Sequence, residues 1–252
     1  KCRSVGPEIE GVLKAFDVYV HDGKVNPAYF PHMSFKLFSQ VPSLIPNKYL
    51  IEGDKFAGYG RVLFSDQSEL AYSEVHKRYG NFFEMINSDQ VQFDDFHEIY
   101  HQLLTKLEED GFIRKDGDSG FIKAEPKAHV LSWVWRKGAF PIYAFSDEVK
   151  TIGNDLVMNG YVKYRESLFS PDESDYLNYM FNNALFSDSV ALRNKYDHAS
   201  NIVCDPNDND IKQDYCLFLG MLICIILKIN DELMYVTGKG GVGELVDWPP
   251  LD

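Results

Sequence analysis

The sequence predicts a mainly helical protein with a minor β component. Residues 211–234 carry apolar side chains on nearly every face of a helix, as expected for a helix that is buried on most sides. Apolar residues also recur at helical spacing through residues 66–86 and 94–110. The clearest β signal is at residues 112–123, where two short apolar stretches flank an Asp-Gly turn and predict a hairpin. A chain of 252 residues can bury a sizeable core in one or two domains.

Residues 1–64 give a mixed signal. The side chains of residues 16–21 alternate between apolar and polar, which predicts a strand, and residues 21–24 are typical of a turn. Four prolines between residues 27 and 46 divide the next stretch into short pieces. Closely spaced glycines precede residues 61–64, which we interpret as a bulged or tightly turned strand.

The two predicted helices and the hairpin of residues 66–123 resemble a winged-helix module. DNA binding by such a module requires cations that face the phosphates. The second helix has Lys106 as its one cation and also carries six acidic residues: Asp94, Asp95, Glu98, Glu108, Glu109 and Asp110. We therefore do not expect DNA to be a partner, and interpret this module as a packing or protein-contact element. It belongs to an N-terminal α+β region that we place at residues 1–140.

The second half of the chain is expected to be a helical domain over residues 141–236, followed by a Gly- and Pro-containing tail at residues 237–252. Residues 129–145 are rich in aromatic side chains, and we interpret them as the core that joins the two halves. Residues 147–169 have helical spacing, and Ser170 with the Pro and acidic residues after it predicts a new helix start.

Two stretches imitate ligand sites. Residues 238–243 match the first residues of a variant Walker A loop. The loop continues with Lys and then Ser or Thr, whereas this chain has Glu244 and Leu245. The Asp-rich residues 205–210 lack the Gly and the terminal Glu of an EF-hand loop. We therefore expect neither ATP nor Ca²⁺ to bind there, and we expect no cofactor and no metal site elsewhere.

A polar cluster follows an apolar step at residues 190–192. It contains Arg193, Asn194 and His198. In a helix, Asn194 and His198 would share a face, whereas Arg193 and His198 would lie about 140° apart. The last two can meet if the helix breaks near His198, if the long Arg193 stem reaches round, or if a second copy of the chain supplies one of them. The alternative is a structural helix end, in which Arg193 pairs with Asp197 and His198 complements the helix dipole.

The pattern Arg193-Asn194-x-x-x-His198, with Leu192 before it and a long apolar helix after it, resembles the R-x4-6-H motif of HEPN domains. The resemblance extends over residues 146–233, although Ala199 and Ser200 stand where family members often carry Gly. It implies a helical bundle that dimerises and brings its two motifs together at the dimer interface. Many HEPN domains cleave RNA without metal, leave a cyclic phosphate and act in phage defence by abortive infection or in toxin–antitoxin systems. Others have lost activity and serve as binding modules.

The residue types of the motif suit RNA cleavage, because RNA supplies its own nucleophile, the 2′-OH. His198 can transfer a proton near neutral pH. The Arg193 guanidinium can bind phosphate oxygens and stabilise the charge that grows on them. We assign Asn194 to orienting His198 or the phosphate, and Lys195 and Tyr196 to substrate binding. The sequence therefore predicts a metal-independent endoribonuclease, with a non-catalytic dimerisation or scaffolding module as the alternative.

Composition limits the partners and the compartment. The net charge of −13 argues against a general binder of nucleic acids or anionic membranes, while leaving room for a small basic cleft that admits RNA. Four cysteines without metal or C-x-x-C spacing predict a reduced protein. The longest apolar run, residues 216–227, is too short for a bilayer, and no signal-peptide pattern opens the chain. We expect a cytoplasmic homodimer without membrane contact, with a regulatory or antitoxin protein as a further partner.

Overall fold

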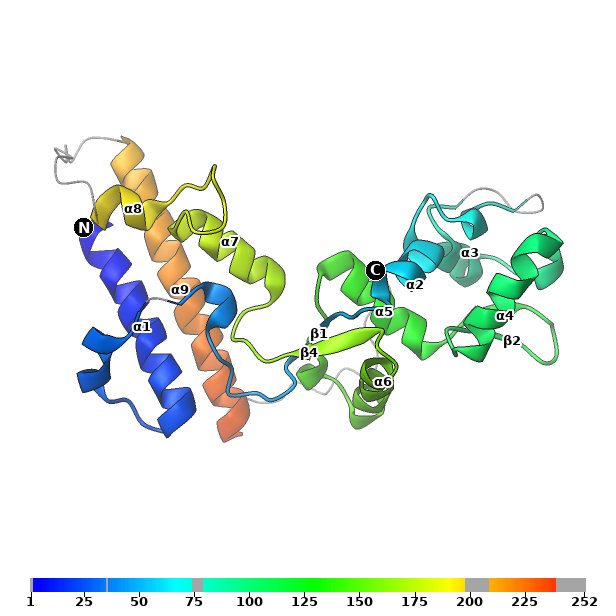
Figure 1. The fold of residues 1–252 in the computed structure, drawn as a ribbon, viewed down its shortest axis with the longest axis horizontal. Coiled ribbons are helices and arrows are strands. Elements are labelled where there is room, and N and C mark those ends of the chain that lie inside the picture. Colours follow the sequence, from blue (N-terminus) through cyan, green and yellow to red (C-terminus); the bar gives the residue numbers. More distant parts are fainter. Residues whose placement is uncertain (1, 35, 74–78, 198–208, 239–252) are drawn as a thin grey trace. The chain divides into compact units, whose positions relative to one another are not determined.

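The computed structural model describes residues 2–34, 36–73, 79–197 and 209–238 (Figure 1). These residues are mainly helical, with two small antiparallel sheets of two strands each, which confirms the predicted fold class at this level. The chain divides into two compact units. Of the described residues, the terminal unit combines those up to 48 with those of 166–238, and the central unit contains residues 49–165. Within the described residues, the chain therefore crosses between the units twice.

The described part of the terminal unit contains four α-helices and the two 3-10 helices η1 (Pro27–His32) and η2 (Phe38–Gln40). The α-helices are α1 (Cys2–Asp22), α7 (Pro171–Phe181), α8 (Leu192–Asp197) and α9 (Asn209–Thr237). Helices α1 and α9 pack side by side (Figure 1), and their first turns meet where Cys2 Sγ lies 3.6 Å from the Ile211 carbonyl oxygen. The long helix predicted at residues 211–234 is confirmed as α9. Ser170 caps α7 in a capping box with Glu173, as the predicted helix start requires.

The strand predicted at residues 16–21 is wrong, because these residues belong to α1. The buried residues Ile9, Leu13 and Phe16 recur at the spacing of one helix face, and this longer stripe outweighs a brief alternation. The helix ends at Asp22, and Gly23 follows with a φ of +69°, so the turn expected at residues 21–24 begins later than predicted.

The predicted division near residue 140 differs from the observed one. Helix α1 and residues 38–48 join the C-terminal helices instead of the α+β region. Phe38 shows why, since its ring is fully buried and lies edge-on to Phe169 at 5.8 Å and to Phe181 at 5.6 Å. These contacts join parts of the chain that are remote in sequence, and the local patterns on which the division was based do not report them.

A buried ion pair joins the last turns of α9 to the chain just before its first crossing. Lys48 and Glu232 are 1% and 2% exposed. The Lys48 ammonium donates to the Leu168 carbonyl oxygen at 2.6 Å and to Glu232 Oε1 at 2.5 Å. Glu232 also accepts hydrogen bonds from the Ser43 hydroxyl and the Leu44 backbone N–H. Burial holds the pKa of Lys48 below its ordinary value, although the Glu232 carboxylate acts in the opposite direction.

The central unit surrounds one apolar core with short helices and two sheets. Strand β1 pairs antiparallel with β4, and β2 with β3. The elements in chain order are β1 (Tyr49–Glu52), α2 (Phe56–Phe64), η3 (Glu69–Ala71), α3 (Phe82–Ser88), η4 (Phe93–Asp95), η5 (Glu98–Tyr100), α4 (His101–Glu109), β2 (Ile113–Lys115), β3 (Ile122–Ala124), α5 (Pro126–Lys137), η6 (Ile142–Ala144), α6 (Asp147–Met158) and β4 (Val162–Arg165). The hairpin predicted at residues 112–123 is confirmed as β2 and β3.

The strand predicted at residues 61–64 is wrong, because these residues form the end of α2. The glycine that suggested a bulge serves helix packing instead. A Cβ atom on Gly60 would lie 2.6 Å from the indole ring of Trp135 on α5. Glycine at this position therefore lets α2 approach α5 closely, a requirement that only the tertiary structure reveals.

The two helices predicted at residues 66–86 and 94–110 are shorter than expected. The first is divided between η3 and α3, and the second begins only at His101. Before it, Asp95 accepts the Gln92 N–H at 2.7 Å and His97 accepts the Ile99 N–H at 3.3 Å. These side chains stabilise separate 3-10 turns, since they satisfy the backbone locally. The likeness of this region to a winged helix stays a prediction.

The aromatic residues of 129–145 contribute to the core of the central unit, whereas the sequence predicts them as a core between the two halves. Helix α5 and η6 lie inside the core of the central unit, where the Phe140 and Phe145 rings stack with centroids 4.5 Å apart. The helix predicted at residues 147–169 ends at Met158, and Gly160 turns the chain into β4 with a φ of +77°. Within the described part of the chain, no helix combines the length and the apolar character that crossing a bilayer requires.

Candidate functional site

Helix α8 carries most of the motif that the sequence singles out. Its buried residues Leu192 and Tyr196, 0% and 2% exposed, lie one turn apart and anchor the helix in the terminal unit. Arg193 and Asn194 occupy the partly exposed positions between them. His198 lies outside the described residues, as do the Asp-rich stretch 205–208 and the glycine tail from residue 239 onward. The structure therefore shows the Arg-Asn half of the motif.

Arg193 is paired with Glu10 of α1. Arg193 Nε lies 2.5 Å from Glu10 Oε1, and the two side chains are 30% and 15% exposed. Lys14, one turn further along α1, lies 4.0 Å from the other carboxylate oxygen of Glu10. Two cations thus flank one carboxylate, which leaves this cluster with a formal charge of +1 in a protein whose overall charge is −13.

Asn194 faces the loop that follows α7. Its Nδ2 atom donates to Asn183 Oδ1 at 2.6 Å. Arg193 and Asn194 line the same hollow of about 550 Å³, together with Glu10, Lys14 and Asn183. The other lining residues are Met33, Ser34, Leu37, Asn182 and Ala184. Most of this lining is polar, and amide, hydroxyl and cationic donors meet there as the binding of a phosphate group requires.

Lys195 and Tyr196 are directed to Asp214 of α9. The Tyr196 hydroxyl donates to Asp214 Oδ2 at 2.6 Å, and the Lys195 ammonium contacts the same oxygen. Asp214 is 7% exposed, so this contact fixes α8 onto α9. Burial, and then the hydrogen bond to Asp214, raise the pKa of the Tyr196 phenol above its ordinary value. The structure thus gives these two residues a shared contact away from the hollow that Arg193 and Asn194 line.

The partners of the motif residues are not predicted from the sequence. Glu10, Lys14 and Asn183 are distant from Arg193 in the sequence, and no local pattern marks them. Asp214 did carry a signal, because a carboxylate near the start of an apolar helix needs a partner when it is buried. The spacing of Asp214 from Lys195 in the sequence does not by itself predict that the two side chains form an ion pair.

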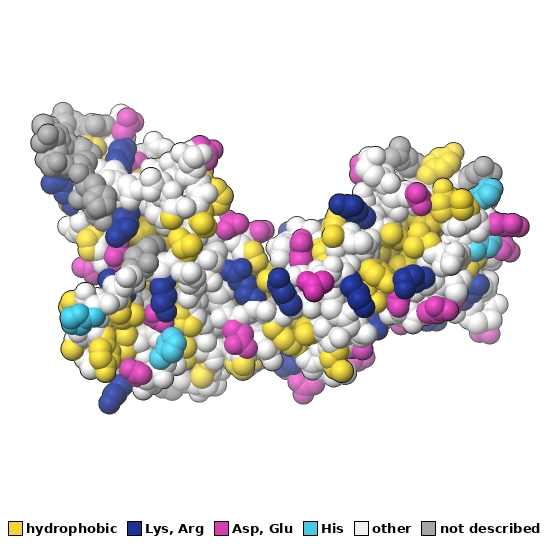
Figure 2. All heavy atoms as spheres, in the orientation of Figure 1, with side chains coloured by type: hydrophobic (Ala, Val, Ile, Leu, Met, Phe, Trp, Pro, Cys, Tyr) yellow, Lys and Arg dark blue, Asp and Glu magenta, His cyan; other side chains and the backbone are white. Residues whose placement is uncertain are grey.

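The charges around the hollow differ from those of a general nucleic-acid binder. On the face seen in Figure 2, basic and acidic side chains are interspersed, and no broad basic surface is present. Among the residues that the structure describes, no group of three or more His, Cys, Asp or Glu side chains is placed to hold a metal ion.

Comparison with protein-family models, curated proteins and solved structures found no match for this chain. The likeness to HEPN domains accordingly stands on the residues of the motif.

Proposed function

We propose that this protein is a metal-independent endoribonuclease of HEPN type that acts in phage defence or as the toxin of a toxin–antitoxin pair. The supporting observation is that Arg193, Asn194 and Lys14 line the same hollow in the terminal unit. It offers two cationic groups and an amide to one phosphate, while the protein as a whole is acidic. The test is cleavage of a mixed RNA pool in EDTA, with analysis of the product ends for a 2′,3′-cyclic phosphate.

The proposed reaction is a transesterification within the RNA. The 2′-oxygen attacks the adjacent phosphorus, the bond from phosphorus to the 5′-oxygen breaks, and a 2′,3′-cyclic phosphate forms. His198 transfers a proton in this exchange, by taking it from the 2′-OH or by giving it to the departing 5′-oxygen. The Arg193 guanidinium stabilises the charge on the non-bridging oxygens. No water is consumed and no metal enters this step.

In this reaction the phosphate competes with Glu10 for Arg193. We expect Glu10→Gln to strengthen RNA binding, because it removes the carboxylate 2.5 Å from Arg193 Nε and raises the formal charge of the cluster by one. One unit charge at short range in water changes the binding free energy by about 1 kcal/mol, which corresponds to roughly fivefold tighter binding at low salt. Binding of a labelled RNA oligonucleotide at several salt concentrations measures this effect.

Glu8→Gln is the matched control, since it removes the same charge from an exposed position of the same helix. It should change RNA affinity little. If Glu10→Gln instead weakens binding as strongly as loss of Arg193 does, then Glu10 positions the guanidinium and does not compete with the phosphate.

The second candidate function is a dimerisation or scaffolding module, and the surface of α9 favours it. Ile223, Ile226 and Leu227 are 55%, 46% and 56% exposed, and their spacing places them on one face of the helix. Beside them, an apolar groove of about 390 Å³ runs between α7 and α9. Within one chain, α9 is thus left partly uncovered despite its apolar character. A second copy of the chain would cover this face.

We therefore expect a homodimer at micromolar concentration. Multi-angle light scattering should give twice the mass of the chain, and the double substitution of Ile223→Glu and Leu227→Glu should give a monomer. Buried carboxylates without partners oppose association strongly. Met158→Glu is the control, because Met158 is 86% exposed on the central unit. A monomeric parent protein would contradict both the dimer and an active site shared between two copies.

A further inference from the structure

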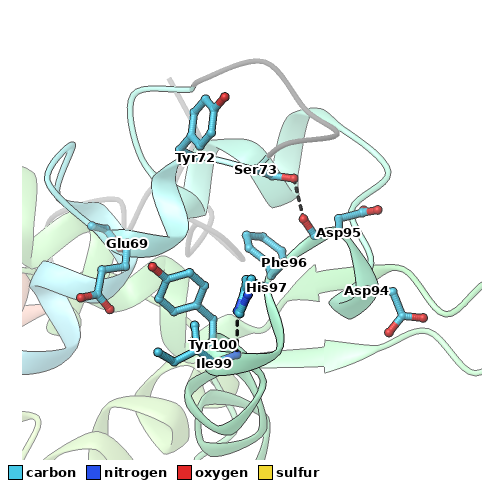
Figure 3. A pocket seen from close by; sticks show the side chains of 10 residues that line it. Glu69, Tyr72, Ser73, Asp94, Asp95, Phe96, His97, Ile99 and Tyr100 are labelled. Carbon is cyan, nitrogen blue, oxygen red and sulfur yellow. Dashed lines mark hydrogen bonds between the residues drawn. The ribbon is translucent and has the colours of Figure 1, made fainter.

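The central unit contains a second hollow, of about 720 Å³, between η3 and the turns η4 and η5 (Figure 3). In Figure 3, Glu69 and Tyr72 lie on the η3 side, and Phe96, His97 and Tyr100 lie on the other. The remaining lining residues are Ser68, Ser73, Asp94, Asp95 and Ile99. Aromatic rings and carboxylates thus share one concave surface, a combination that the proposed ribonuclease does not use.

Two of the aromatic and apolar side chains of this hollow are open to solvent. Tyr72 is 60% exposed and Ile99 is 72% exposed, while Tyr100 is half-buried. Exposed apolar groups that gather around a hollow mark a binding surface more often than isolated ones do. The faces of tyrosine rings attract cations. The central unit already uses such a contact close by, because Lys115 Nζ lies 3.6 Å from the centre of the Phe93 ring.

The Asp and Glu side chains give the described lining of the hollow a negative charge. Glu69, Asp94 and Asp95 line the hollow, and none of the described lining residues is Lys or Arg. Asp95 is committed to the backbone N–H of Gln92, at 2.7 Å. Glu69 and Asp94 make no hydrogen bond or ion pair to any residue that the structure describes. His97 Nδ1 accepts the Ile99 N–H at 3.3 Å.

We infer that this hollow binds a lysine or arginine side chain of a partner protein. The cationic head would lie between the Glu69 carboxylate and the rings of Tyr72 and Tyr100, where charge attraction and cation–π attraction add. The aliphatic stem of the same side chain would cover Ile99, because long basic side chains pack their methylene groups on apolar surface. This apolar area favours a side chain with a stem over a small inorganic cation. The hollow belongs to the central unit, whereas the candidate RNA site belongs to the terminal unit.

The test measures binding of acetyl-Gly-Ser-Xaa-Ser-Gly-amide peptides to the full chain by saturation-transfer difference NMR, which detects weak complexes. Peptides with Lys or Arg at the Xaa position should bind, with saturation of their side-chain methylene groups. Norleucine has a stem without charge and should bind at least about fivefold more weakly, since it lacks the ionic attraction. A Glu peptide should not bind. Equal binding of the Lys and norleucine peptides would overturn the inference.

Substitutions locate the contact. We expect Glu69→Gln to weaken Lys-peptide binding about fivefold and Tyr100→Leu about threefold, whereas Tyr100→Phe, which keeps the ring, should retain it. Glu98→Gln is the matched control, because Glu98 is exposed on η5 and does not line the hollow. An equal loss with Glu98→Gln would show a general charge effect and refute the site. Free spermidine that binds more tightly than the Lys peptide would show that a small polyamine, and not a protein side chain, is the ligand.

Discussion

Arg193→Ala and His198→Ala are each expected to lower the rate of RNA cleavage by about 10²–10⁴-fold, the range for loss of general acid–base catalysis or of a transition-state donor. Single-turnover cleavage in EDTA measures the chemical step without a contribution from product release. Asn194→Ala should cost less, because its role is to orient another group. Arg193→Lys keeps the charge beside Glu10 but loses the planar fork that binds two phosphate oxygens, so it should remain well below the parent rate.

Thermal unfolding of the same variants separates catalysis from structure. Arg193 is 30% exposed, so its loss should destabilise the protein only slightly, and Arg193→Lys less still. The catalytic proposal fails if the parent protein cuts no RNA and Arg193→Ala and His198→Ala both melt far below it. In that case the motif is a structural helix end, and the dimerisation module becomes the better account of the protein.

Glu232→Ala is expected to lower the free energy of unfolding of the terminal unit by about 3–5 kcal/mol, because it leaves the Lys48 ammonium buried without its carboxylate. The Ser43 hydroxyl and the Leu44 N–H would lose their acceptor at the same time. Denaturant unfolding followed by circular dichroism measures the change. The two units can unfold in separate transitions, and only the transition of the terminal unit should move.

The ion pair of Glu173 and Lys228 provides the control. Its side chains are 44% and 24% exposed, so Glu173→Gln should cost less than about 1 kcal/mol, and glutamine can still complete the cap of α7. Replacing both buried residues, as Lys48→Met with Glu232→Leu, should recover part of the loss, since no charge is then left unpaired. A Glu232→Ala variant no less stable than Glu173→Gln would refute the structural role of the pair.

The parts of the fold that the sequence predicts correctly are those with local causes. The apolar length of α9, the cap at Ser170 and the Asp-Gly turn between β2 and β3 each depend on residues close together in the chain. The errors have causes that are distant in sequence. The glycine at position 60 leaves room for the Trp135 ring and does not mark a strand bulge. Helix α1 joins the terminal unit because its apolar stripe packs in the same core as α9.

The candidate site divides in the same way. Arg193 and Asn194 stand out from their immediate neighbours, and the structure does bring them to one hollow. Their partners Glu10 and Asn183 come from other elements of the terminal unit, so no spacing rule relates them to the motif. The sequence predicts Lys195 as a phosphate ligand beside Arg193. In the structure, the Lys195 ammonium forms an ion pair with the Asp214 carboxylate of α9.

The double crossing of the chain sets an order of events during synthesis. The described residues of the central unit lie within one continuous segment, 49–165, so this segment can fold as soon as it has left the ribosome. Helix α1 is made before this segment, yet α9, which covers its apolar stripe, is made after it. Because contacts between such distant segments form slowly, the hollow around Arg193 comes together only after α8 has been made and docked. Under the proposed function, a ribosome that stalls before α8 would release a chain that cannot yet cut RNA.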